Sequence, residues 1–466
     1  MNFLKKILSP TCLAISSLLL IYTFYRSEIY WNGDKRYYYN IYYIISSLLI
    51  CFSIITFFMS QKIKEYLIIL IMSLIMSLYL LEGYLTIKKR PLKEQISKEQ
   101  LLKEQLYEKQ TGYKWDRRTK FQIYQDLKKN DNEVAVSVYP SIYKKENNSI
   151  FPLSGISNFK TINCNENGYY SIYQSDRYGF NNPDEEWDSM EIEYLLVGDS
   201  FTHGACVNRP NDIASVLRDL SNKSVLNLGY GKNGPLIKYA TLREYLNSNV
   251  KKVFWIYFAG NDLMDLTHEV DNKILMSYLD NLTFTQNLKS KQNEINNLAI
   301  NLIENSKILF QREKEKERIR KINDSFTLKF VKFIKIYNLR ELMNLTAQDL
   351  EPVPEPTLKP TSKLTLKPEF RRIIKLAKDL TIRNNSKLYF VYLPKYSDYK
   401  TNYDDPNYNL IKNIVNELKI PFIAIHKKVF EKEQNPSKFY PFGLPGHFNV
   451  EGYKKVAETI YKFSKK

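Results

Sequence analysis

Three apolar stretches within the first 90 residues constrain the fold of this chain more than any other feature. They are Ile7–Tyr25, Ile41–Met59 and Tyr66–Leu81, the last of which continues across Glu82 to Ile87. Each approaches the roughly 20 residues that a helix needs to cross a bilayer. Because no small-residue cleavage site follows the first stretch, we expect it to stay in place as a span. Residues 1–90 are therefore predicted to form a membrane anchor of three transmembrane helices.

The charge of the chain does not indicate nucleic-acid binding. The sequence holds 68 Lys and Arg against 50 Asp and Glu, a formal net charge of +18. The lysines are spread along the chain, without a basic cluster interleaved with aromatic residues. The four cysteines include no CxxC pair, so we expect no zinc or other metal site, and no cofactor is indicated.

The polar part of the chain divides into segments of different pattern. Residues 91–133 repeat KEQ and favour an exposed, charged helical stalk. Residues 134–190 show short β-like runs separated by Asn and Gly turns. From 191 to 466, strands alternate with helices, which predicts a parallel, doubly wound α/β sheet. A long segment at about 269–370 interrupts this alternation.

Chemically capable residues follow the predicted strands and precede the last helix. Ser200 follows a buried strand that begins at Tyr194, and backbone amides at such a turn can converge on a developing negative charge. A glycine-rich loop follows the next strand, and Asn261 follows a third. His447 lies in a Gly/Pro-rich loop before the terminal helix. Since ligands bind at the carboxyl ends of parallel strands, these residues are candidates for one site.

Four blocks make the chain resemble the SGNH, or GDSL-like, hydrolase superfamily. They are GDSF at 198–201, NLGYGKNGP at 227–235, AGND at 259–262 and HFNVEGY at 447–453. The lead-in SDRYGFNN also looks like membrane-anchored envelope members of this superfamily. The resemblance covers about residues 191–466 outside the insert. It implies a three-layer α/β/α flavodoxin-like hydrolase domain.

The resemblance also implies roles for individual residues. Ser200 would attack an ester carbonyl, and His447 would accept its proton and later activate water. Asn261, the Ser200 amide and one amide of the glycine block would form the oxyanion hole. The spacing leaves Gly231 and Gly234 both open for that last position.

One departure from the family pattern concerns the residue that orients the histidine. The family usually carries Asp three residues before His, where this chain has Leu444. No carboxylate lies within ten residues before His447. Either a Ser–His dyad uses a carbonyl to orient the ring, or an acid arrives from elsewhere in the chain. The other histidines, His203, His268 and His426, are expected to be surface residues.

Cys164 and Cys206 flank the candidate nucleophile in sequence and lie in polar loops. We hypothesise a disulfide between them that pins the lead-in against the active-site edge; the alternative is two free thiols. A disulfide requires an oxidising compartment. The Lys and Arg counts around the spans are nearly balanced. The basic group at 88–93 favours a cytoplasmic main domain, whereas Lys5 and Lys6 inside, with three spans, would put that domain outside, in agreement with a disulfide. We therefore expect a multi-pass protein of a cell inner membrane with a periplasmic catalytic domain.

The insert at about 269–370 has two contrasting parts. Lys289–Asn338 is largely helical and charged, and Glu351–Pro368 is rich in Pro and Lys, which favours extended conformation. Two interpretations stay open at this point: a lid or partner surface over the site, or a tolerated surface excursion.

Together these features predict a membrane-anchored serine esterase or O-acyltransferase. Its substrate would be an acylated saccharide, with acetyl esters of envelope polysaccharide as the expected class. Transfer would require a membrane acyltransferase partner, since three spans are too few for a donor-handling domain. Two alternatives are a catalytically inactive envelope-binding or scaffold protein, favoured by Leu444, and a lipase or thioesterase of the same fold. The lipid bilayer is the other expected partner, and nucleic acid is not.

Overall fold

The computed structural model describes residues 2–30, 33, 36–145, 149–305, 326–342, 367–399 and 407–465. These residues fall into two compact units, each of which draws on separate parts of the chain. The first comprises Met1–Ser97 and Lys314–Lys359. The second comprises Lys98–Glu313 and Pro360–Lys466.

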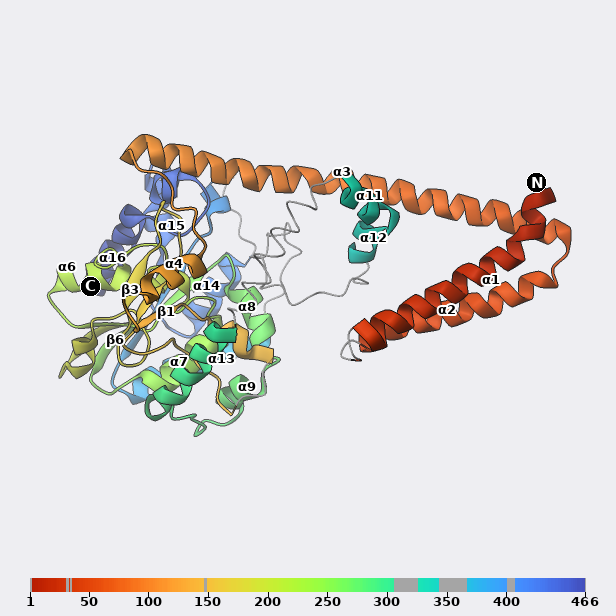
Figure 1. Cartoon of the computed structure of the whole chain (residues 1–466). Helices are drawn as coiled ribbons and strands as arrows, with labels where there is room; N and C mark the ends of the chain where they lie inside the picture. Colours follow the sequence, from red (N-terminus) through yellow and green to blue (C-terminus); the bar gives the residue numbers. More distant parts are fainter. Residues whose placement is uncertain are drawn as a thin grey trace. The chain divides into compact units, whose positions relative to one another are not determined.

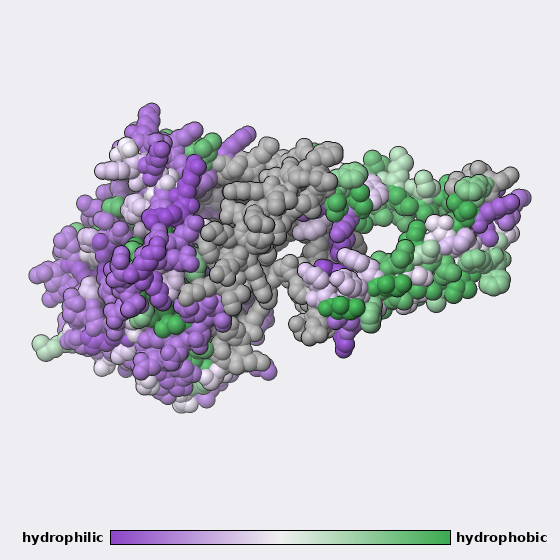
Figure 2. All heavy atoms as spheres, viewed as in Figure 1, coloured by the Kyte–Doolittle hydropathy of each residue, from purple (hydrophilic) through white to green (hydrophobic). Residues whose placement is uncertain are grey.

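The first unit consists mainly of long apolar helices (Figures 1 and 2). They are α1 (Asn2–Phe24), which runs into a π-helical segment at Tyr25–Tyr30, α2 (Arg36–Phe57) and the first part of α3 (Gln61–Thr111). Three stretches are long and apolar enough to cross a membrane: Lys5–Tyr30, Tyr39–Phe57 and Gln61–Ile87. The helices α1 and α2 pack against each other, with the Ser16 and Ser53 hydroxyls 3.4 Å apart.

The third apolar stretch and the stalk that follows it form one helix. The helix α3 runs without a break through both and ends at Thr111. Gly112 follows with a φ of 74°, a left-handed conformation that commonly ends helices and that glycine adopts without strain. The shorter helix α4 (Lys120–Lys128) then begins at a capping box, in which Thr119 and Gln122 bond each other's backbone amides.

Between residues 134 and 174, the chain forms a small sheet of three short strands. These are β1 (Val134–Val136), β2 (Lys160–Ile162) and β3 (Ile172–Gln174). The strands β1 and β2 pair in parallel, and β3 pairs antiparallel with β2.

The second sheet confirms the predicted fold class. Its strands are β4 (Ile192–Val197), β5 (Val225–Asn227), β6 (Val250–Phe258), β7 (Lys387–Leu393) and β8 (Phe422–Ala424). All neighbours are parallel, and the order is β5-β4-β6-β7-β8. In sequence order this is 2-1-3-4-5, the flavodoxin-like arrangement.

Alternating side chains of the central strands fill two separate cores. In β6, Val253, Trp255 and Tyr257 enter one hydrophobic cluster, and Phe254 and Ile256 enter the other. Both faces are covered, which explains why the strands appear in the sequence as continuous apolar runs. The first cluster takes residues from α7 (Pro235–Tyr245), α13 (Pro368–Arg383) and α14 (Tyr408–Glu417), and the second from α6 (Ile213–Ser221) and α16 (Val450–Ser464).

The insert does not behave as one segment. Its first part follows α8 (Asp262–Glu269) and includes α9 (Lys273–Asp280) and a helix over 292–305, whose Ile295, Ala299 and Ile303 are buried in the first core. Its later helices, α11 (Phe326–Ile334) and α12 (Tyr337–Leu342), belong to the first unit. Residues 351–366, most of the Pro/Lys-rich segment, lie outside the described residues.

Candidate active site

Ser200 begins the short helix α5 (Ser200–His203) directly after β4. Asp199 caps this helix by accepting a hydrogen bond from the Phe201 amide at 3.0 Å. A side chain at Gly198 would collide with the Thr202 hydroxyl, so only glycine permits this tight passage from strand to helix. The local sequence thus places the Ser200 hydroxyl at the carboxyl edge of the sheet, where ligands bind in such folds.

His447 reaches Ser200 from the loop before α16. Its Nε2 lies 2.9 Å from the Ser200 Oγ, and its ring packs 4.9 Å from the Phe201 ring, centroid to centroid. Asn449 caps α16 by accepting from the Gly452 amide, and its own amide donates to the Lys438 carbonyl. Asn449 therefore ties the end of the histidine loop both to α16 and to the segment around Lys438.

Glu166 provides the carboxylate that the sequence blocks lack. Its Oε1 lies 2.9 Å from the His447 Nδ1, and its Oε2 accepts from the His447 backbone amide at 2.6 Å. Burial acts to raise the pKa of Glu166, but the charge on His447 and these hydrogen bonds outweigh it and lower the pKa below its usual range. A carboxylate acceptor fixes the Nδ1–H tautomer, so Nε2 is left to accept the Ser200 proton.

The approach of Glu166 depends on Gly446. A Cβ at this position would lie 2.6 Å from the Glu166 Oε2, closer than a methyl group and an oxygen can approach. The glycine before His447 thus makes room for the carboxylate that contacts the next backbone amide.

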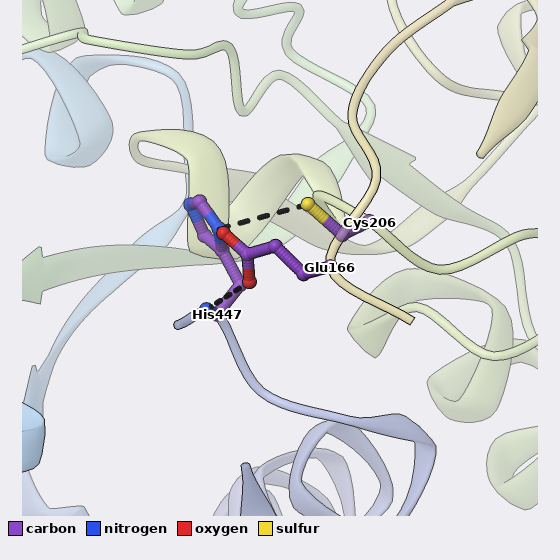
Figure 3. Close-up of side chains that lie close together, drawn as sticks. All are labelled: Glu166, Cys206 and His447. Carbon is purple, nitrogen blue, oxygen red and sulfur yellow. Dashed lines mark hydrogen bonds and ion pairs between the residues drawn. The ribbon is translucent and has the colours of Figure 1, made fainter. Parts of the chain in front are cut away.

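A disulfide between Cys164 and Cys206 holds the Glu166 turn beside the nucleophile. Cys206 is six residues after Ser200, and its Sγ lies 3.8 Å from the His447 Nδ1 (Figure 3). The side-chain amide of Asn167 donates to the Cys206 carbonyl at 2.8 Å, so the turn is fixed on both sides of Glu166. The structure therefore contains the predicted disulfide between Cys164 and Cys206, and this bond links the segment before the sheet to the loop after Ser200.

These same side chains form the one cluster of metal-ligand type among the described residues. Ligand-type atoms of Glu166, Cys206 and His447 lie within 4.8 Å of one another. The Cys206 sulfur is bonded to Cys164 and is not a thiolate, which is the form that binds metals. The geometry therefore fits a hydrogen-bonded relay rather than a metal centre.

The structure separates the two glycines proposed for the oxyanion hole. Gly231 lines the pocket beside Ser200. Gly234 does not serve there, because its amide donates to the Glu269 Oε1 at 2.7 Å and faces the start of α7. Asn261 lies immediately before α8, and its side-chain oxygen is buried without a hydrogen-bond partner. This oxygen is an acceptor and cannot stabilise an oxyanion, so that role would fall to the Nδ2 donors of Asn261.

A buried ion pair braces the loop that carries Asn261. Lys238 of α7 donates to Asp262 and to the Ile256 carbonyl, the latter at 3.0 Å. Both acids near it, Asp199 and Asp262, are fully buried. Burial raises the pKa of each, and the charge of Lys238 opposes this rise. Asp199 and Asp262 therefore act as loop braces.

Two histidines that were expected at the surface are buried, which corrects that prediction. His203 packs against Tyr173 and Tyr230, and its Nδ1 donates to the Gly229 carbonyl at 3.3 Å. Burial lowers its pKa to about 4, so it is neutral at pH 7. His426 is also buried and packs edge-on against Tyr408. The aromatic neighbours come from distant segments, which local polarity cannot reveal.

The pocket beside Ser200 is small and mostly walled by aromatic rings and small residues. The volume open to the centre of a water-sized sphere is about 10 Å³. A space of this size holds about one water molecule. The lining residues are Ser137, Tyr139, Asn163, Ser200, His203, Ala205, Tyr230 and Gly231.

Comparison with known proteins adds little to this geometry. No protein-family model matches the chain, and no curated protein does. Among solved structures it is similar to a protein from Desulfitobacterium hafniense DCB-2 that is provisionally named a lipolytic protein of the G-D-S-L family. The two are 12% identical with a TM-score of 0.30, over 58% of this chain and 99% of that one. At this level of likeness nothing is carried over from the neighbour.

Proposed function

We propose that this protein is a membrane-anchored serine esterase or O-acyltransferase that acts on short acyl esters. The observation that carries the proposal is the hydrogen-bonded relay from Ser200 through His447 to Glu166. Each member has the neighbour that nucleophilic acyl transfer needs: a hydroxyl, a base beside it and an acid behind the base.

The proposed reaction follows from the positions of these atoms. The Ser200 Oγ attacks the ester carbonyl carbon while the His447 Nε2 takes its proton. Glu166 stabilises the imidazolium, and the amides of Ser200 and Gly231 with the Asn261 side chain receive the oxyanion. The imidazolium protonates the leaving alkoxide, and an acyl-Ser200 ester is left. Water or a sugar hydroxyl, deprotonated by His447, then attacks this ester and frees Ser200.

The size of the pocket supports a short acyl group. A volume of about 10 Å³ for a water-sized sphere accommodates the methyl of an acetyl group but not a long acyl chain. Such a pocket favours an acetyl esterase over a lipase or thioesterase. The relay likewise favours an enzyme over an inactive scaffold, since Glu166 takes the place that Leu444 leaves without an acid.

The proposal that the substrate is an envelope polysaccharide rests on two features outside the relay. Apolar helices anchor the chain, and a disulfide beside the site suits an oxidising compartment. We propose an inner-membrane protein with its catalytic unit in the periplasm, where acetylated saccharides would be accessible. Transfer instead of hydrolysis would need a membrane partner that delivers an activated acyl group.

The test is ester hydrolysis by the purified full-length protein with 4-nitrophenyl acetate and with acetylated polysaccharide. Ser200→Ala should abolish acetate release, whereas Ser277→Ala on α9 should leave it unchanged. A fluorophosphonate probe should label the wild type and fail to label Ser200→Ala. Equal hydrolysis by wild type and Ser200→Ala would contradict the enzyme and favour the scaffold.

A matched series of 4-nitrophenyl esters tests the acyl group. We expect kcat/KM to be highest for acetate and to fall steeply from butyrate to octanoate. A rise with chain length would contradict the pocket argument and favour a lipase.

A further inference from the structure

The later part of the insert joins the membrane-type unit, although it lies between α9 and α13 in sequence. Both of those helices belong to the α/β unit, whereas Lys314–Lys359 belongs with Met1–Ser97. Within the first unit, α11 and α12 lie beside α3 (Figure 1). This placement differs from both interpretations considered for the insert, a lid over the site and a surface excursion of the α/β unit.

The contact centres on Glu82, the acid inside the third apolar stretch. Glu82 is fully buried, and its carboxylate accepts from the Asn338 amide at 3.0 Å, the Leu339 amide at 2.8 Å and the Asn338 side chain at 2.8 Å. A carboxylate within a membrane span is costly unless it is paired. The first backbone amides of α12 provide that pairing, since they have no partner inside their own helix.

Further contacts extend this interface along α3 and to α2. The Tyr79 hydroxyl donates to the Ile334 carbonyl at 2.9 Å, and the Tyr79 and Phe333 rings lie 5.4 Å apart. Arg340 donates to the Tyr42 hydroxyl at 3.2 Å. The contacted residues of α3 belong to the last turns of the stretch Gln61–Ile87, so they lie within about 12 Å of its end along the helix.

The outer side of these two helices is apolar. Phe330 is 54% exposed, Ile334 is 49% exposed and Leu342 is 66% exposed. Lys332 and Lys335, also exposed, are interspersed with them. Long lysine stems can lie along apolar surface while their ammonium groups reach the headgroup region. Exposed apolar residues beside an apolar span, with lysines between them, fit a bilayer interface.

We propose that α11 and α12 form a re-entrant hairpin that inserts into the lipid bilayer beside the carboxyl-terminal half of the third span. Glu82 docks the hairpin by binding the start of α12. Phe330, Ile334 and Leu342 face acyl chains, and the lysines lie at the headgroups. The α/β unit would thereby be tied to the membrane through this hairpin as well as through α3. The inference is independent of the proposed chemistry.

Site-directed spin labels on the full-length protein test the hairpin. In a Cys12→Ser, Cys51→Ser background, which keeps the disulfide, single cysteines would replace Ile334, Leu18 or Met190. Leu18 is exposed on α1 and marks lipid; Met190, 96% exposed in the α/β unit, marks water. In vesicles of phosphatidylcholine and phosphatidylglycerol, collisions with oxygen and with a nickel chelate would be measured at each label.

The label at Ile334 should resemble the Leu18 label, with an oxygen-to-nickel collision ratio several-fold above that of Met190. A ratio equal to that of Met190 would overturn the proposal. Glu82→Ala should shift the Ile334 label toward the Met190 value, whereas Glu108→Ala, later in the same helix, should not. If Glu82→Ala fails to insert, Asn338→Pro, in the first turn of α12 where proline is tolerated, removes both the amide and the side-chain donor of Asn338 and should give the same shift. An unchanged ratio there would refute the docking role of Glu82.

Discussion

Glu166 gives both of its oxygens to His447, one to the ring and one to the backbone amide. This two-point contact fixes the orientation of the imidazole and the position of the loop with a single side chain. The ring then has one way to present Nε2 to Ser200. An acid located far away in sequence therefore takes the position that was expected for an Asp three residues before the histidine.

Replacing Glu166 tests this at the residue scale. Glu166→Gln should lower kcat for 4-nitrophenyl acetate by up to about 10⁴-fold, because the amide can no longer stabilise the imidazolium or enforce the tautomer. Glu185→Gln, an acid outside the site, is the matched control and should retain activity. Wild-type kcat in Glu166→Gln would mean that a carbonyl orients His447.

His203 should make the protein sensitive to acid. Its pKa is about 4 when folded, against an ordinary value of 6.5. Between these values the unfolded chain binds a proton that the folded chain does not, so the free energy of unfolding falls as pH drops through this window. The full shift corresponds to about 3 kcal/mol.

The measurement compares thermal unfolding of wild type and His203→Asn in detergent at pH 7 and pH 4.5. The asparagine amide can replace the donor to the Gly229 carbonyl but does not titrate. We expect the wild-type midpoint to fall more than that of the variant between the two pH values. Parallel falls would show that His203 contributes nothing to the acid sensitivity.

At the scale of elements, the turn around Glu166 is built from three independent attachments. The disulfide joins it to the loop after α5, Asn167 bonds the Cys206 carbonyl, and Asn165 donates to the Asp116 carbonyl at 2.9 Å. The last turns of α3 contact the neighbouring loop that carries His447. There Lys103 donates to the Pro445 carbonyl at 2.7 Å, two residues before His447.

Removal of the disulfide should reduce both stability and activity. The double variant Cys164→Ser, Cys206→Ser frees a loop of 42 residues of sequence separation, which corresponds to about 4 kcal/mol in the chain-entropy model. Because Glu166 would lose one of its anchors, kcat should fall as well. The control, Cys12→Ser with Cys51→Ser, should change neither. Unchanged kcat in the double variant would show that hydrogen bonds alone hold the turn.

The elements differ in how far the sequence predicts them. Strands such as β4 and β6 are predictable because both of their faces are buried and their residues are continuously apolar. Ser200 and His447 are predictable because each is set in a short local pattern. Glu166 is not, since it meets His447 across 281 residues of sequence. The one sequence signal for Glu166 is Cys164, two residues earlier, because the predicted disulfide to Cys206 would bring this segment close to Ser200.

At the scale of the whole molecule, the packing of the insert cannot be predicted from the sequence, because it too depends on contacts between distant segments. The insert is continuous in sequence, yet its first helices are buried in the α/β core and α11 and α12 join the apolar helices. Only partners that come from distant segments, such as Glu82 for Asn338, decide where each part packs.

The orientation of the molecule in the membrane is tested by labelling intact cells and spheroplasts. A cysteine at Met190, in the Cys12→Ser, Cys51→Ser background, should react with a membrane-impermeant maleimide once the outer membrane is permeable. A cysteine at Asn2, before the first span, should react only after lysis. The reverse pattern would place the catalytic unit in the cytoplasm.

If the protein is an exported enzyme as proposed, the link between Cys164 and Cys206 also affects when it becomes active. A newly made chain with both thiols reduced would already hold Ser200 and His447, but Glu166 would lack its covalent anchor. Oxidation after export would then complete the relay. The bond would serve as a maturation step that delays acyl chemistry until the chain has left the compartment in which it was made.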